Sequence, residues 1–377
     1  MFLSLQPQSE KTTAKVLKKV KANPSLLEAR ATNLAPLIND GYTLLLTAVS
    51  HGNLTITRAL LELSPELIQQ KTLAGQGCLH LAVKHPAIVE YLLASAMTDP
   101  PPKGVNAPID LSGVTPAKLA WSKGQKNVAR QLLEDGDWSV LPILPSSPRL
   151  SLMPYGEVGR GEVPGWRARM EDAATVSASY VGVYDGHGGS GVSELLSSQD
   201  MLAEDWKSVD ARTREGFKGQ GSTACVVDFS SARCLNVGDS KAVAYGGDGS
   251  VTDLSPEHSL EGDRAALERA EGVTVKEGRV WKGKDSLAMS RAFGDWEFKG
   301  EGGGGVSCER DETPLPEGWE WVVVACDGLW DTVTAEKAWA AIREGGGVVD
   351  IADRLTRLAI GEGSEDNVSV VVVRRSK

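Results

Sequence analysis

The 377 residues suffice for two domains, and their net charge of −10 at pH 7 is uneven: residues 1–140 contain 14 Lys and Arg against 11 Asp and Glu, whereas the remainder contains 26 against 39. Neither part is basic enough to indicate a nucleic-acid partner, and no apolar run approaches the roughly 20 residues of a membrane span, so neither nucleic acid nor membrane is expected to bind. The five cysteines show no zinc-site spacing and an odd count, which argues against a disulfide framework and indicates reduced thiols.

Residues 1–137 begin without an export signal and contain an internal sequence repeat. The first residues, MFLSLQPQSEK, lack the basic start and apolar core of a signal peptide, so a cytoplasmic or nuclear location is expected. Residues 41–62 align with residues 75–94 at a shift of 34, and residues 113–134 show the pattern again. Each unit predicts a turn, a helix with a small packed residue, and a second helix ending in two leucines. One unit cannot cover its own apolar face, so neighbours must stack. The segments resemble ankyrin repeats, which implies an α-helical ankyrin repeat array.

Such an array offers a long surface to other proteins. We favour a protein partner bound on the ankyrin repeats, and the alternative is a docking platform for the second half of the same chain. Residues 12–39 are either a diverged first repeat or an N-terminal cap.

A change of composition after Asp137 marks the end of the array. The next residues include Pro142, Pro145, Pro148 and Pro154, which exclude a helix or a central strand. Residues 138–154 are therefore predicted to be a Pro-rich linker.

Acidic residues follow several apolar runs in the second half of the chain. The run Tyr180–Tyr184 predicts a buried strand that stops at Asp185, followed by Gly186, His187 and two more glycines. A carboxylate at a strand end, with glycines that let carbonyl groups approach, suits a hard divalent cation, although Asp-Gly alone equally fits a turn. Further acids lie at the edges of Val-rich runs, at positions Asp239, Asp327, Asp331 and Asp366. Buried carboxylates gathered in this way need cations to neutralise them, so the pattern favours a metal site.

Seven segments of the second half carry a family resemblance. They are GWRARMED (165–172), YDGHGG (184–189), GSTA (221–224), NVGDSKAV (236–243), AMSRAFGDWEFK (288–299), ACDGLWD (325–331) and GSEDNVSVVVV (363–373). Residues 155–377 closely resemble the metal-dependent serine/threonine protein phosphatases of type 2C. The resemblance implies a four-layer α-β-β-α phosphatase domain, so the whole chain is expected to be α+β.

The same resemblance implies which residues bind cations. Two Mg²⁺ or Mn²⁺ ions would be bridged by Asp185, with the carbonyl of Gly186 at one ion and Asp327 and Asp366 at the other. Acids matching a weaker third ion, or holding metal-bound water, are Asp239, Asp331, Glu171 and Asp172.

The implied chemistry is hydrolysis of phosphoserine and phosphothreonine in phosphoprotein substrates. A bridging water or hydroxide would attack phosphorus directly. Arg167 would hold the substrate phosphate, and His187 would protonate the departing oxygen. The residues Ser290, Arg291 and Asp295 are expected to brace the core rather than react.

Other phosphatase mechanisms lack the residues that they need. No cysteine has an arginine six positions later, and only His187 and His258 lie after residue 137, too few for a His-rich binuclear centre. The alternative from another class is a pseudophosphatase scaffold that binds phosphoproteins without hydrolysis. It requires a broken metal or phosphate position, whereas Arg167, Asp185, Asp327 and Asp366 are all present.

Overall fold

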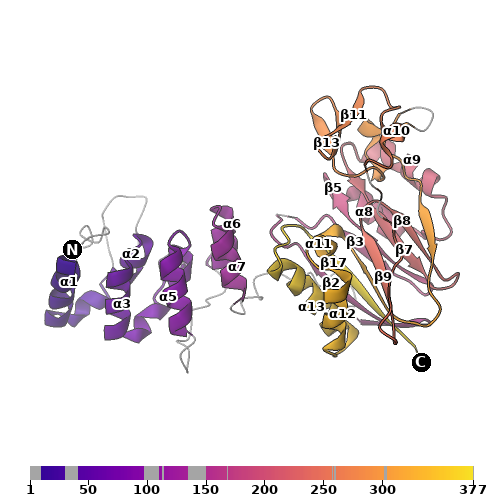
Figure 1. Ribbon diagram of the computed structural model, residues 1–377. Helices are drawn as coiled ribbons and strands as arrows, with labels where there is room; N and C mark the ends of the chain where they lie inside the picture. Colours follow the sequence, from indigo (N-terminus) through magenta and orange to yellow (C-terminus); the bar gives the residue numbers. More distant parts are fainter. Residues whose placement is uncertain are drawn as a thin grey trace. The chain divides into compact units, whose positions relative to one another are not determined.

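The computed structural model describes residues 10–29, 41–96, 110–112, 114–134, 150–167, 169–256, 258, 260–300 and 304–376. These residues belong to two compact units, residues 1–140 and residues 141–377 (Figure 1). Within these ranges no helix is long and apolar enough to cross a bilayer. All five cysteines are buried, and none forms a disulfide.

Helices that pack in successive pairs make up the first unit. They are α1 (Glu10–Ala22), α2 (Leu44–Ser50), α3 (Leu54–Leu63), α4 (Cys78–Ala82), α5 (Pro86–Ala96), α6 (Pro116–Ser122) and α7 (Lys126–Glu134), with 3₁₀ helices at Pro24–Leu27 and Pro65–Gln69. Helix α2 contacts α3 and α4, α4 contacts α5 and α6, and α6 contacts α7. The small residues that the repeat pattern places at the packed face, Ala48, Ala82 and Ala120, are fully buried. Close approach of neighbouring pairs therefore depends on these alanines.

Polar side chains at the turns join one helix pair to the next. The hydroxyl of Thr43 caps α2 by accepting the backbone N–H of Leu46 at 3.4 Å. The buried His80 accepts the Gly77 N–H at Nδ1, and its Nε2 donates to the carbonyl of Val114 at 3.0 Å. This last bond links α4 to the turn before α6, so His80 has a structural role.

Two antiparallel sheets form the centre of the second unit. The six-stranded sheet has the order β1 (Leu150–Met153), β2 (Gly156–Val163), β17 (Val368–Arg375), β16 (Trp319–Ala325), β9 (Lys241–Gly246) and β10 (Val251–Asp253). The five-stranded sheet has the order β15 (Asp311–Pro314), β8 (Arg233–Val237), β7 (Ala224–Asp228), β4 (Tyr180–Tyr184) and β3 (Ala173–Val176). Valines dominate the layer between the sheets, including Val181, Val227, Val322 and Val371. The alternation of apolar residues along these strands thus fills one shared core.

Helices cover the outer face of each sheet (Figure 1). Helices α12 (Ala335–Arg343) and α13 (Val348–Gly361) lie on the six-stranded sheet, and α8 (Gly191–Ser198) and α9 (Trp206–Gly216) lie beside the five-stranded one. Gly159 and Gly161 of β2 let α13 approach, because a Cβ on Gly159 would stand 2.3 Å from the Val348 backbone. The predicted four-layer α-β-β-α arrangement is confirmed for this unit.

The structure corrects the predicted start of this unit. Strand β1 lies inside the stretch predicted to be a linker (residues 138–154) and pairs with β2 from Leu150↔Gly159 to Met153↔Gly156. The sheet therefore begins before Tyr155. Its position at the sheet edge agrees with the nearby Pro154, since proline cannot donate a ladder hydrogen bond. Residues 138–149 of the predicted linker lie outside the described residues.

Smaller elements surround one end of the two sheets. A three-stranded sheet consists of β11 (Val273–Lys276), β12 (Arg279–Lys282) and β13 (Asp285–Leu287), next to the short helix α10 (Arg264–Leu267). A second small sheet has the order β14 (Phe293–Gly294), β6 (Gly221–Ser222) and β5 (Gly186–His187), and a 3₁₀ helix follows at Trp296–Phe298. The short helix α11 (Asp327–Trp330) starts directly after β16.

Candidate active site

The strand register brings the predicted acids to one end of the two sheets. Asp185 directly follows β4, and Asp172 directly precedes β3, whose Ala173 pairs with Tyr184. Asp327 begins α11 after β16, and Asp366 stands two residues before β17, which pairs with β16. Strands β3 and β4 are antiparallel neighbours in one sheet, β16 and β17 in the other, and β17 packs against β3 and β4 across the core. Asp172 and Asp366, 194 positions apart in the sequence, therefore lie at the same end of the two sheets.

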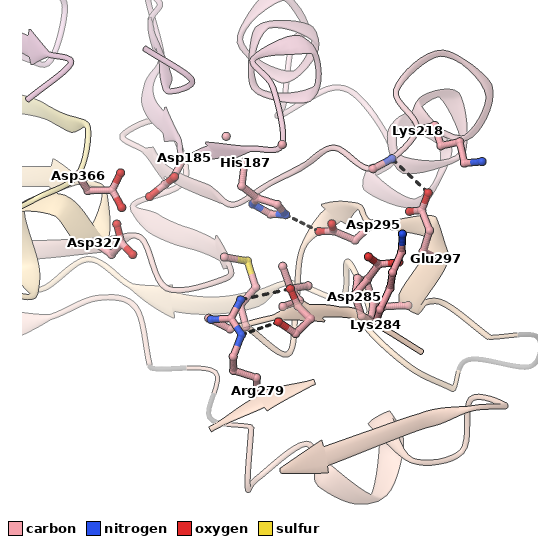
Figure 2. A pocket seen from close by; sticks show the side chains of 18 of the residues that line it. Asp185, His187, Lys218, Arg279, Lys284, Asp285, Asp295, Glu297, Asp327 and Asp366 are labelled. Carbon is pink, nitrogen blue, oxygen red and sulfur yellow. Dashed lines mark hydrogen bonds and ion pairs between the residues drawn. The ribbon is translucent and has the colours of Figure 1, made fainter. Parts of the chain in front are cut away.

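The carboxylates face one another across a shared pocket (Figure 2). Asp185 and Asp327 are close enough that ligand atoms from both, together with Cys326 Sγ, lie within 4.8 Å of one another. Arg167 Nη2 donates to Asp366 Oδ2 at 2.6 Å. The pocket has a volume of about 860 Å³. All six residues predicted to bind the two cations, the phosphate or the leaving group line it: Arg167, Asp185, Gly186, His187, Asp327 and Asp366.

Burial and mutual repulsion disfavour the ionised form of these acids. Burial, with the nearby charges of Asp327 and Asp366, raises the pKa of Asp172 to about 7. Burial and the charges of Asp172 and Asp327 hold the pKa of Asp185 well above its usual value. Burial also raises the pKa of Asp366. Several buried carboxyl groups at one place therefore repel one another unless cations join them.

Unpartnered oxygen atoms give an independent test of whether cations fit. Asp172 Oδ2, Asp239 Oδ1 and Asp327 Oδ1 are buried and have no hydrogen-bond partner among the described residues. Buried polar atoms normally have partners, and carboxylate oxygens are the ligands that Mg²⁺ and Mn²⁺ prefer. The donor set therefore fits hard divalent cations.

The residues predicted for a third ion lie beside this cluster. Burial, followed by the charge of Asp327, raises the pKa of Asp239 to about 7, and the charge of Asp331 adds to the effect. Asp331 itself is exposed at the end of α11. Glu171 lines a smaller neighbouring pocket together with Arg167 and Asp366. All four acids therefore gather at the same end of the sheets as the two-cation residues.

Two residues that the sequence reasoning did not select fix the backbone of this site. Asn367 accepts the Glu171 N–H at 2.8 Å and donates to the carbonyls of Pro164 and Arg169 at 2.9 Å, so it ties the segment of Arg167 to the loop of Asp366. In the sequence, the position of Asn367 directly after the predicted ligand Asp366 was the signal that could have identified it.

The second supporting residue is Thr223, which directly precedes β7. Its hydroxyl accepts the Asp185 N–H at 3.0 Å, and its own N–H donates to the Asp185 carbonyl at 2.9 Å. The hydroxyl also contacts Ser240 Oγ at 2.6 Å, next to Asp239. One buried threonine thus joins the loops of two acids.

His187 lies on the other side of Asp185, and its ring contacts an acid that the sequence reasoning had assigned to the core. His187 Nε2 is 2.7 Å from Asp295 Oδ2. Burial opposes a charged imidazole, but the hydrogen bond and charge of Asp295 outweigh burial, so the pKa of His187 is raised. The site therefore combines an acid cluster, a guanidinium and a histidine that favours its protonated form.

A family assignment follows from the sequence match to this unit. Residues 157–368, more than half of the chain, match the sequence model of the family described as Protein phosphatase 2C. The chain belongs to this family. The matched range contains the whole site of the phosphatase 2C domain, from Arg167 to Asp366.

Relatives of the phosphatase 2C domain include two proteins of Oryza sativa subsp. japonica. Probable protein phosphatase 2C 7 is 30% identical over 250 residues, which cover 57% of this chain and 65% of that protein. Probable protein phosphatase 2C 45 is 32% identical over 247 residues, which cover 57% of this chain and 86% of that protein. A solved phosphatase structure from Toxoplasma gondii aligns with 59% of this chain and 93% of its own chain, at 22% identity and a TM-score of 0.49. The match thus spans less than two thirds of the first relative.

Proposed function

We propose that the protein is a metal-dependent phosphatase that hydrolyses phosphoserine and phosphothreonine in proteins. The observation that carries the proposal is the convergence of Asp185, Asp327 and Asp366 with Arg167 in one pocket. A pocket of about 860 Å³ accommodates a phosphorylated side chain with its flanking residues. The family of the domain agrees with this reading.

Two Mg²⁺ or Mn²⁺ ions are the proposed cofactors. Asp185, the Gly186 carbonyl, Asp327 and Asp366 would hold them, and Asp239 and Asp331 would hold a weaker third ion. When bound, such ions lower the pKa of a water molecule and neutralise charge on phosphoryl oxygens. The donors are carboxylate and carbonyl oxygens, and burial holds the pKa of the neighbouring Cys326 thiol well above its usual value, so the cluster favours these hard cations over zinc.

The remaining steps belong to side chains of this chain. Arg167, with its side chain 56% exposed at the pocket edge, is placed to bind two phosphoryl oxygens through its guanidinium fork. Water attacks phosphorus in line, and no phosphoenzyme forms. His187 then gives a proton to the departing serine or threonine oxygen, a role that contributes about 10² to 10⁴ in rate.

Phosphate release from a phosphothreonine peptide tests the proposal. We expect wild-type protein to release phosphate with Mn²⁺ and to stop in excess chelator. Asp185→Asn, Asp327→Asn and Asp366→Asn should abolish release, whereas His187→Ala should slow it and leave Mn²⁺ binding by calorimetry intact. Wild-type protein that binds the peptide but releases no phosphate with either metal would favour the pseudophosphatase scaffold instead.

For the first unit we propose ankyrin repeats that bind a protein partner or substrate. Three helix pairs with the buried alanines Ala48, Ala82 and Ala120 support this reading. The side chains of Leu73 and Leu111, in the turns before α4 and α6, are exposed at 64% and 80%. The backbone N–H of Leu111 donates to the Ala74 carbonyl at 2.9 Å, so the two turns lie side by side. Exposed leucines on adjacent turns suit an apolar contact with another protein.

A further inference from the structure

The small sheet behind the catalytic pocket brings His187 and Asp295 together across a glycine. In this sheet the central strand is β6, and Gly221 pairs with His187 on one side and with Gly294 on the other. Asp295 follows Gly294 directly, and its carboxylate reaches back over Gly221 to the imidazole. A Cβ on Gly221 would stand 2.1 Å from Asp295 Oδ2 and 2.4 Å from His187 Nε2. Only glycine leaves room for this contact.

The backbone of Asp295 is held in a conformation that non-glycine residues seldom adopt. Its φ of 50° lies in the left-handed region, which costs free energy unless the surroundings impose it. Two bonds impose it: the Asp295 N–H donates to the Gln220 carbonyl at 3.0 Å, and the Asp295 carbonyl accepts the Phe298 N–H at 2.8 Å. The residue is 4% exposed, so its carboxylate is both buried and directed.

A buried ion pair on α9 supports the strand that carries Asp295. Asp210 accepts the Gly294 N–H at 2.8 Å and pairs with Lys299 Nζ at 2.6 Å. Lys299 also donates to the Ala292 carbonyl at 3.0 Å. Both side chains of the pair are less than one tenth exposed. The position of Asp295 is thus fixed from α9 through β14.

The hydrogen bond decides which ring nitrogen of His187 is available. A carboxylate only accepts hydrogen bonds, so Nε2 must carry the proton that Asp295 accepts. The other nitrogen, Nδ1, is buried and has no hydrogen-bond partner among the described residues, in a side chain that is 28% exposed. Figure 2 shows the ring between the acids of the cluster and Asp295, with Nε2 on the Asp295 side. Nδ1 is therefore the ring nitrogen whose hydrogen-bonding capacity is left unused within the described residues.

We propose that Asp295 is the positioning residue of His187, holding Nε2–H so that Nδ1 faces the leaving oxygen of the phosphorylated residue. Without this acceptor the ring can rotate, and the Nδ1–H of the imidazolium no longer faces the leaving oxygen. The inference rests on the proposed function, because it assigns the atom that delivers the proton in that reaction. The step balances: the attacking water forms a new P–O bond and loses a proton to solvent, while the P–O bond to the side chain breaks and its electron pair stays on the side-chain oxygen. That oxygen takes the Nδ1 proton, and the electron pair of the N–H bond stays on Nδ1.

Leaving-group dependence separates this role from a structural one. A serine or threonine alkoxide is strongly basic and needs a proton, whereas p-nitrophenolate is weakly basic and leaves without one. We expect Asp295→Asn to lower kcat for a phosphothreonine peptide by about 10²-fold, with KM unchanged, and to lower kcat for p-nitrophenyl phosphate by less than about threefold. Equal losses on both substrates, or no loss on either, would overturn the proposal.

Matched variants keep the test decisive. Asp311→Asn removes the acid of the other histidine pair, in which His258 Nε2 lies 3.1 Å from Asp311 Oδ2, and should leave the ratio of the two activities unchanged. Gly221→Ala keeps Asp295 but pushes it from the ring, so it should reproduce the selective loss even if Asp295→Asn does not fold.

A second readout needs no turnover. In metal-free protein above the pH at which His187 titrates, nitrogen NMR of the imidazole, assigned by the missing signals of His187→Gln, should show Nε2–H in wild type and lose this preference in Asp295→Asn. An Nδ1–H tautomer in wild type would refute the inference while phosphatase activity persists. A wild-type chain inactive on both substrates would instead overturn the proposed function, and this inference with it.

Discussion

Because the pKa of Asp172 is raised in the folded state, the stability of the metal-free protein should depend on pH. Asp172 is 8% exposed, and burial together with the charges of Asp327 and Asp366 raises its pKa to about 7. An aspartate in the unfolded chain titrates near 3.9, so between these values the folded state binds more protons. The free energy of unfolding therefore falls as the pH rises toward 7. Above pH 7 it stays at the lowered value, because Asp172 is then ionised in both states.

The size of this effect follows from the proton balance. Between pH 6 and pH 8 the unfolded Asp172 stays ionised while the folded residue changes from mostly protonated to mostly ionised, which costs about 1.4 kcal/mol. Asp172→Asn removes this term. We expect the stability of the variant relative to wild type to increase by that amount from pH 6 to pH 8. For a unit of this size the change corresponds to roughly 3–6 °C in Tm.

Thermal unfolding in chelator at both pH values, monitored by circular dichroism, measures the effect. Asp228→Asn is the control, because hydrogen bonds from Ser230 and Ser231 overcome burial and lower the pKa of Asp228, so its titration ends below this pH range. Saturating Mn²⁺ should abolish the pH-dependent difference, since cations stabilise the ionised cluster. A variant that instead loses stability relative to wild type as the pH rises would refute the reasoning.

Three further predictions concern packing and docking. Asp210→Ala leaves the buried ammonium of Lys299 without its carboxylate partner and should lower the stability of the phosphatase 2C domain by about 3–5 kcal/mol in denaturant titrations. Replacing both residues by apolar ones should recover most of this loss. Gly159→Ala places a Cβ 2.3 Å from the backbone of α13 and should cost about 1–3 kcal/mol in thermal unfolding, while Gly216→Ala, which meets nothing within 4 Å, should be neutral or stabilising. Leu73→Asp should raise KM for a protein substrate held by the repeats and leave peptide kinetics unchanged; equal kinetics on both would argue against docking there.

The acids of the site were predictable because each stands next to an apolar run. A carboxylate directly before or after a Val-rich strand lies at one end of a sheet whatever the topology, and several such carboxylates imply a common site. The positions of Asp185, Asp327 and Asp366 follow this rule. The repeat pattern likewise predicted the buried Ala48 and Ala82.

The contact between Asp295 and His187 could not be predicted from the sequence in this way. It depends on a two-residue strand, on a glycine that lies between it and His187, and on a left-handed backbone conformation, none of which has a periodic signal. Strand β1 was missed because prolines flank it, and the sequence does not distinguish an edge strand from an extended linker.

The ion pair between Arg167 and Asp366 has a consequence for the order of events. Both side chains are more than one third exposed, so their contact contributes only about 0–1 kcal/mol. An anion arriving at the pocket mouth can therefore replace Asp366 as the partner of the guanidinium at little cost. Any cation that engages Asp366 weakens the same contact, so metal loading and phosphate capture favour each other, and by linkage each must tighten the other to an equal degree.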